Sequence, residues 1–63
     1  EYPPNHLAVA EGIAVLGDRG AAIRRYGQAL ALARTLERSL HPDAPEWIEE
    51  ALRELEALGV ARR

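Results

Sequence analysis

The segment over residues 16–30 constrains the fold of this chain more than any other. It opens with Leu16-Gly17, a helix stop, because glycine readily adopts the left-handed conformation that ends many helices, and Asp18 can cap the next helix. Beyond this cap, small and bulky residues recur every three or four positions, at Ala22, Tyr26, Ala29, Ala33, Leu36 and Leu40. This spacing places them on one stripe of a long helix, predicted over residues 19–40.

The apolar face of this long helix is broader than one neighbour requires. Ile23 and Leu30 widen the stripe on one side, and Leu32 widens it on the other. Alanines around the aromatic ring of Tyr26 also permit close approach of other helices. We therefore expect the long helix to pack against two neighbours.

Two shorter helices are predicted to flank it. Prolines at positions 3 and 4 indicate an extended lead-in over residues 1–4, and Asn5 is placed to cap a helix over residues 6–16. That helix is apolar almost all round, with His6 and Glu11 as its polar side chains, so it requires cover on more than one side.

The third predicted helix, over residues 44–58, is amphipathic, with an acidic outer face. Asp43 and Glu46 have the spacing of a capping box, Pro45 suits a first helical turn, and Gly59 ends the helix before a short tail over residues 60–63. The sequence thus predicts an all-α fold of three antiparallel helices in one unit spanning residues 1–63. The side chains expected to pack inside it are Ala22, Tyr26, Ala29, Ala33, Leu36, Trp47, Leu52 and Leu55.

An internal match at an offset of forty-two residues relates the first and third helices. Pro3 falls on Pro45 and Leu16-Gly17 on Leu58-Gly59. Val9, Ala10, Ile13 and Val15 fall on Ala51, Leu52, Leu55 and Ala57. This match predicts equivalent roles for the two short helices, with the long helix touching both.

Composition sets limits on the class of protein. The chain has 63 residues, of which 48% are hydrophobic but only three are aromatic, so its core is small for a domain that folds alone. Its formal net charge of −2 gives no general attraction to nucleic acid, and it contains no cysteine and no apolar run long enough to span a membrane. With no initiator methionine and no signal-peptide pattern, we expect a segment of a longer soluble, cytoplasmic protein.

The stretch over residues 16–32 resembles the tetratricopeptide repeat. That family has a Leu-Gly-Asp turn, as at Leu16-Gly17-Asp18, and then a helix with an aromatic between small residues, as at Ala22, Tyr26 and Ala29. The continuation to His41-Pro42-Asp43 resembles the forty-two-residue variant of kinesin light chains. The resemblance covers about one and a half repeats. The first helix matches loosely, because Ala10 stands where the family usually has glycine and Ile13 where it prefers tyrosine.

This resemblance implies a hairpin of two helices plus a capping helix, with a role in protein–protein interaction or scaffolding. The peptide-binding surface of such repeats is lined by the first helices, here by Leu7, Glu11 and Ala14, with no basic set to grip a carboxylate.

The residues themselves predict no catalytic, cofactor or metal site. His41 near Asp43 and Glu46 could form a ligand set, but a histidine at a helix end is simpler, and no His-x-x-x-His pair exists. Pairing of the arginines on the long helix with the acidic third helix is simpler than nucleic-acid binding. We therefore expect no enzyme, no nucleic acid and no membrane span.

The anomaly is the first helix, which the chain itself covers mainly on one side. We expect a protein partner, or preceding repeats, to dock on it and on the N-terminal half of the long helix. The residues predicted at this interface are Leu7, Val9, Ile13, Val15 and Ile23. Two alternatives are a small homodimer that buries the first helix, and a helical appendage of a larger enzyme complex.

Overall fold

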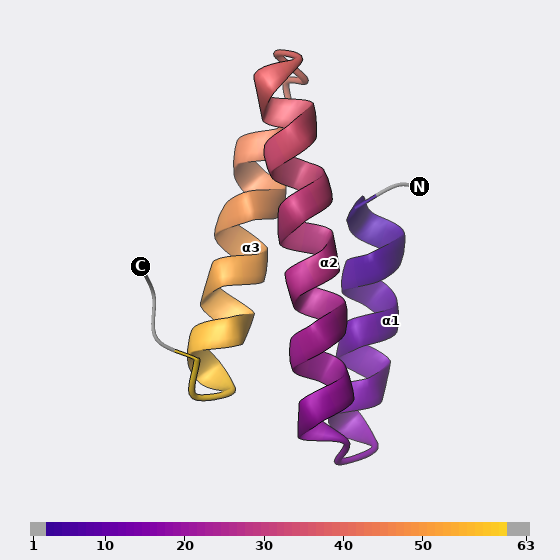
Figure 1. Ribbon diagram of the computed structural model, residues 1–63. Helices are drawn as coiled ribbons and strands as arrows, with labels where there is room; N and C mark the ends of the chain where they lie inside the picture. Colours follow the sequence, from indigo (N-terminus) through magenta and orange to yellow (C-terminus); the bar gives the residue numbers. More distant parts are fainter. Residues whose placement is uncertain (1–2, 61–63) are drawn as a thin grey trace.

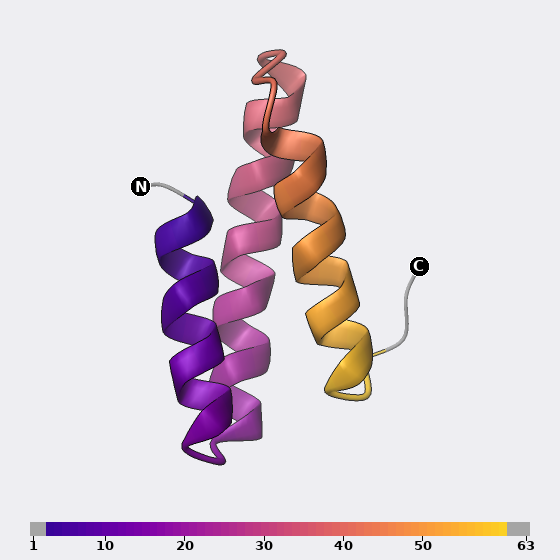
Figure 2. The ribbon, with the colours of Figure 1, turned by 180° about the vertical axis from the view of Figure 1, so that it is seen from behind.

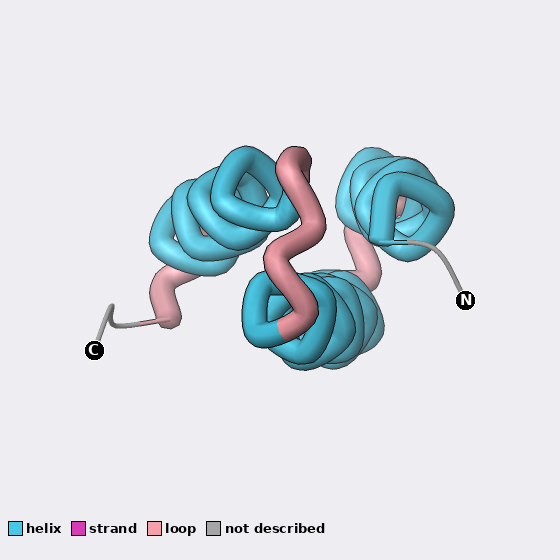
Figure 3. The backbone as a smooth tube through the Cα atoms, turned by 90° about the horizontal axis from the view of Figure 1, so that it is seen from above, coloured by secondary structure: helices cyan, strands magenta, loops and turns pink. Residues whose placement is uncertain are grey.

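The computed structural model describes residues 3–60, which form three α-helices and no strand (Figure 1). They are α1 (Pro3–Val15), α2 (Arg19–Arg38) and α3 (Ala44–Ala57). Successive helices are antiparallel, so α1 and α3 run in the same direction. Seen from above, α1 and α3 lie on one side of α2 (Figure 3). The predicted all-α fold is confirmed.

The long helix α2 holds the other two together. It packs extensively against both α1 and α3, whereas α1 and α3 make few contacts with each other (Figure 2). The buried hydrophobic residues that form the core are Leu7, Ala10, Ala22, Tyr26, Ala29, Ala33, Ala44, Trp47, Ala51 and Leu55. Six of these ten are alanines, so most of the core is built by backbones that approach closely, with Tyr26 and Trp47 supplying bulk.

Two residues of the predicted packing set lie outside this buried core. Leu36, near the end of α2, is half-buried and packs against the core from its edge. Leu52 is half-buried on the side of α3. It lies one position beyond Ala51, which contacts the core, and one position turns a helix by about 100°.

The start of α1 differs from the prediction. The helix begins at Pro3 instead of His6, and Asn5 is an exposed residue inside it. Proline is compatible with a first helical turn, where its missing N–H would have no intrahelical partner. Pro3 is also fully buried, so packing favours this longer helix. Residues 1–2 of the predicted lead-in lie outside the described residues.

The two N-caps differ from each other. Asp18 caps α2 as predicted, because its Oδ1 accepts a hydrogen bond from the backbone N–H of Ala21 at 3.1 Å. Asp43 makes no such side-chain bond to α3. Its own backbone N–H donates instead to His41 Nδ1 at 3.2 Å. The capping box expected from Asp43 and Glu46 is therefore wrong, and the histidine shapes this turn.

All three helices end in the same backbone motif. The second residue past the end of each helix has a positive φ: 90° at Gly17, 62° at Leu40 and 94° at Gly59. In each case the next residue donates its N–H back into the last turn, from Asp18 to Ile13 O, His41 to Leu36 O and Val60 to Leu55 O. These are Schellman motifs. The second helix therefore ends at Arg38, before the predicted Leu40, and two of the three motifs use glycine.

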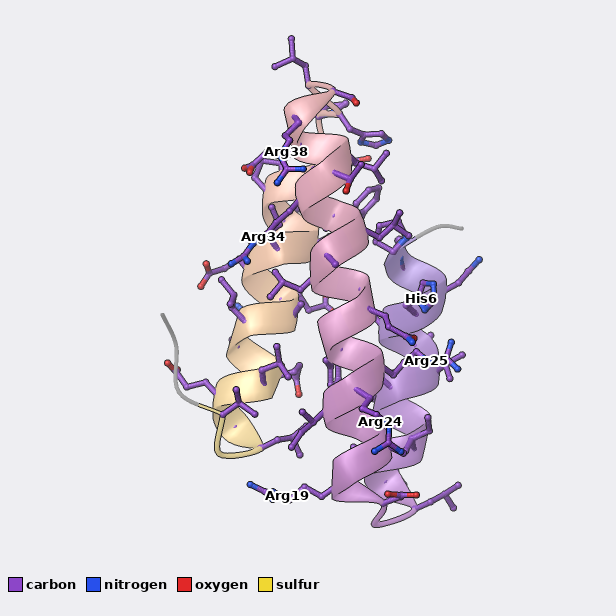
Figure 4. The ribbon with its side chains drawn as sticks, viewed as in Figure 1. His6, Arg19, Arg24, Arg25, Arg34 and Arg38 are labelled. Carbon is purple, nitrogen blue, oxygen red and sulfur yellow. The ribbon has the colours of Figure 1, made fainter. Side chains whose placement is uncertain are left out.

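An unpredicted contact joins the start of α2 to the end of α3. Arg19 Nε donates a 2.7 Å hydrogen bond to the carbonyl oxygen of Leu58, and Figure 4 shows Arg19 at the end of the molecule where α3 finishes. The guanidinium thus lies at the negative end of the α3 dipole, where a cation is favourable.

Leu40 is the strained member of the three helix ends. A non-glycine residue in the left-handed region costs roughly 1–2 kcal/mol, and Leu40 is 88% exposed, so its side chain recovers little by burial. We predict that Leu40→Gly raises the free energy of unfolding by about 1 kcal/mol, after the entropy that glycine adds to the unfolded chain is subtracted. Urea denaturation measures this change.

The matched control is Leu16→Gly. Leu16 is equally exposed, at 86%, but its φ is not positive. Glycine there brings only the entropic cost, so this variant should be slightly less stable than the parent chain. Equal loss of stability in both variants would contradict the strain assigned to Leu40.

Candidate protein-interaction surface

Three of the four exposed large hydrophobic residues in residues 3–60 lie on α1 or directly after it, and the fourth is Leu40, beyond the end of α2. Val9 is 45% exposed, and Val15 and Leu16 are more than 80% exposed. They remain open because α1 packs on α2 along one side and makes few contacts with α3. Within residues 3–60, α1 is therefore covered mainly along the side that packs on α2, although apolar residues occur on several sides of this helix.

The five residues predicted at the interface do not form one surface. Leu7 is only 5% exposed and belongs to the core with Ala10, so it offers little surface to a partner, and its place at an interface stays a prediction. Ile23 is half-buried against the core. The sequence could not separate these faces, because α1 carries apolar residues almost all round and its periodicity does not indicate which side meets α2.

Val9 and Ile13 do share a surface. Together with His6 they follow the spacing i, i+3, i+7, which aligns side chains along one face of a helix. Val15 lies six positions from Val9 and so points to a different face. On α2, Arg25, Gln28 and Leu32 repeat the same spacing, and with His6 they line a surface groove of about 580 Å³. We call these six residues the α1 flank.

A polar contact joins the two helices on this flank. Arg25 Nη1 lies 3.3 Å from His6 Nδ1, and both residues are half-buried. Figure 4 shows the two side chains on the same edge of the molecule. Because guanidinium nitrogens only donate, the imidazole nitrogen accepts this hydrogen bond.

The internal match gives the α1 flank a structural counterpart. Val9 and Ile13 correspond to Ala51 and Leu55, which α3 buries as part of the shared core, and His6 corresponds to Ile48. The open side of α1 is therefore equivalent to the side that α3 packs on α2. In the other direction, Leu7 and Ala14 correspond to Glu49 and Glu56, which are exposed on α3. The positions that pack α1 on α2 are thus occupied in α3 by exposed glutamates.

A second hollow lies on the other side of α1, between α1 and α3. This α1–α3 groove has a volume of about 220 Å³ and is lined by Pro4, Leu7, Ala8, Glu11, Trp47 and Glu50. Figure 3 shows α2 on one side of the two helices that form its walls. Its walls are apolar near the core and carry one carboxylate from each helix.

Tyr26 is a core residue whose pKa is influenced by the carboxylates of this groove. Its side chain is 2% exposed, and its pKa is raised from 10.0, first by burial and then by the charges of Glu54, Glu11 and Glu50. The charges of carboxylates from both walls therefore act on this phenol, although Tyr26 does not itself line the groove. The sequence did not predict that the carboxylates of Glu11 and Glu50 would face one groove. The one indication was that Glu11 is the only acidic residue in a mainly apolar helix.

The remaining candidate chemistry has structural explanations. The ring of His41 packs on Trp47 with centroids 4.9 Å apart, and its Nδ1 accepts the Asp43 hydrogen bond. In residues 3–60 no group of three His, Cys, Asp or Glu side chains lies close enough to hold a metal ion. No helix in the same range is long and apolar enough to cross a membrane.

Comparison with known proteins finds no match to a family model, to a curated protein or to a solved structure. The tetratricopeptide resemblance therefore rests on the residues of this chain alone.

The raised pKa of Tyr26 predicts a loss of stability at alkaline pH. A folded-state pKa above the unfolded value means that the neutral phenol stabilises the fold, and this contribution is lost as the pH rises through the folded pKa. The chain has no lysine, and arginine stays charged, so tyrosines dominate between about pH 9 and 12. Tyr26→Phe should therefore lose less stability over this range than the parent chain, as measured by urea denaturation.

Tyr2→Phe provides the comparison, because it removes the other tyrosine and should leave the alkaline loss in place. Identical pH profiles for Tyr26→Phe and the parent chain would contradict the position assigned to the Tyr26 hydroxyl.

Proposed function

We propose that this chain is a non-catalytic protein–protein interaction module of helical-repeat type. It docks to a protein partner, or to a preceding repeat of its own protein, through the α1 flank. The observation that supports this proposal most directly is the pair of Val9, which is 45% exposed, and Ile13, which is half-buried, at positions equivalent to the buried Ala51 and Leu55.

The character of the flank fits a protein surface as its occupant. It combines apolar side chains with the polar groups of His6, Arg25 and Gln28, and a shallow groove with an apolar body and a polar rim is typical of protein interfaces. The opposite, acidic side of α3 suits the solvent-exposed end of a helical array. These features support a directional unit that is extended at α1 and ends at α3.

The proposal is tested by supplying the flank with a helix like α2. We would place a second copy of residues 1–42 before the chain, so that the junction after Pro42 repeats, with Glu1 and Pro3 in the places of Asp43 and Pro45. Neighbouring repeats stabilise each other, so we predict one cooperative transition at a higher melting temperature than that of the single chain. Circular dichroism and calorimetry measure it.

Val9→Glu in the downstream copy should abolish this gain, because it puts a charge into the docked surface. Val15→Glu is the matched control: Val15 lies on another face of α1, and its variant should keep the gain. Two independent transitions at the melting temperature of the single chain would overturn the proposal. Sedimentation of the single chain as a dimer that Val9→Glu dissociates would instead identify a second copy as the occupant.

A further inference from the structure

The turns that end α1 and α3 are alike in backbone structure as well as in sequence. In each turn, three backbone N–H groups donate to carbonyl oxygens of the preceding helix, at positions that differ by forty-two residues between the two turns. The bonds run from Leu16 to Gly12, Gly17 to Ala14 and Asp18 to Ile13 in the first turn, and from Leu58 to Glu54, Gly59 to Glu56 and Val60 to Leu55 in the second. Gly17 and Gly59 also have similar φ values, 90° and 94°. A group that binds one of these turns therefore indicates what the other can bind.

The turn after α3 binds an arginine from another helix. Arg19, at the start of α2, donates its Nε–H to the carbonyl oxygen of Leu58 at 2.7 Å. A Cβ atom at Gly59 would lie only 2.7 Å from Arg19 Nη2, closer than real Cβ atoms approach other atoms. The guanidinium thus occupies space that is open because this residue is glycine. The last turn of α3 has no basic residue of its own, so Arg19 supplies the cation that the helix dipole favours there.

The turn after α1 presents the same groups, but no side chain of residues 3–60 binds there. The carbonyl oxygen of Leu16 accepts no hydrogen bond from these residues, and a Cβ atom at Gly17 would meet nothing within 4 Å. The last turn of α1 also has no basic residue. The leucines differ in the same way, because Leu58 is half-buried against the core and Leu16 is 86% exposed. The end of α1 therefore exposes each group that Arg19 and α2 cover at the end of α3.

We propose that the helix that docks on α1 carries an arginine in its first turn, and that this arginine binds the turn at Leu16 and Gly17. Its Nε–H donates to the carbonyl oxygen of Leu16, and its guanidinium lies over Gly17, as Arg19 does at the end of α3. The helix runs antiparallel to α1 and covers Leu16. Such binding rests on the docking at the α1 flank proposed above, and it adds the chemistry of the occupant: a helix like α2 that begins with arginine.

The geometry at the end of α3 favours arginine over lysine as the bound cation. There one nitrogen of the guanidinium donates to the carbonyl oxygen while another lies against the glycine, and this requires a planar, branched group. The ammonium of lysine is a single point charge and cannot make both contacts. Asp18, which follows Gly17 where α3 has Val60, also places a negative charge beside the turn after α1.

The chain with the added copy of residues 1–42 tests this site, because it brings the start of α2 from the upstream copy to the end of α1 in the downstream copy. Arg19→Met in the upstream copy removes the cation there and leaves the downstream contact of Arg19 with Leu58 in place. We expect this variant to melt about 2–5 °C below the parent tandem chain, by circular dichroism. Arg24→Met in the upstream copy is the matched control. Arg24 is exposed on the same helix and forms no hydrogen bond or ion pair within residues 3–60, so this variant should melt with the parent.

Gly17 provides a second comparison, in which one substitution is placed in either copy. Gly17→Ala strains the backbone in both copies, because φ is 90° at this position. In the downstream copy the new Cβ also displaces the guanidinium of the upstream Arg19, whereas the upstream copy has no helix before it. We therefore expect the downstream variant to melt at least about 2 °C below the upstream one.

Three results would overturn the arginine site and leave the docking at the α1 flank intact. They are a cooperative gain that upstream Arg19→Met does not reduce, equal losses from upstream Arg19→Met and Arg24→Met, and equal melting temperatures of the two Gly17→Ala variants. Two independent transitions in the parent tandem chain would overturn both the docking and the arginine site.

Discussion

Close packing of α2 against both neighbours is the interaction on which the rest of this structure depends. Alanines at positions 22, 29 and 33 give α2 a narrow ridge that two helices can approach at once. Alanine loses no rotamer entropy on burial but also buries little area. The fold therefore relies on few large side chains, chiefly Tyr26 and Trp47, and on α2 as the only element common to both halves.

This arrangement makes the molecule asymmetric. The helices α1 and α3 lie against the same helix and run in the same direction. The match at forty-two residues pairs them position by position. The side of α3 that packs on α2 corresponds to a side of α1 on which Val9 is exposed and Ile13 is half-buried at the edge of the core. The outer side of α3 is acidic at Glu49 and Glu56. An apolar side on α1 and a charged side on α3 make the two ends of the unit unlike, which is what the proposed docking at α1 requires.

Periodicity was sufficient to predict the helices and the central stripe, because α2 and α3 each have one dominant apolar face. It failed for α1, where apolar residues on every side gave no indication that Leu7 would be buried and Val9 exposed. It also misplaced the start of α1, because the rule that proline disfavours the preceding helical residue was applied where a first turn tolerates proline. The acidic groove could not be predicted, since Glu11 and Glu50 meet only through the shared packing on α2.

The groove and the α1 flank lie on opposite sides of a single helix, and neither is held by direct packing of α1 on α3. Each wall of the groove is positioned by α2 alone, through Leu7 and Ala10 on one side and Ala51 and Leu55 on the other. Tyr26 is buried in the core that α2 shares with both helices, and the charges of Glu54, Glu11 and Glu50 contribute to its raised pKa. A residue that gives the core much of its bulk therefore also carries a phenol whose pKa is raised by burial and by carboxylates of the groove, so the packing of α2 and the charge of the groove are linked through one side chain.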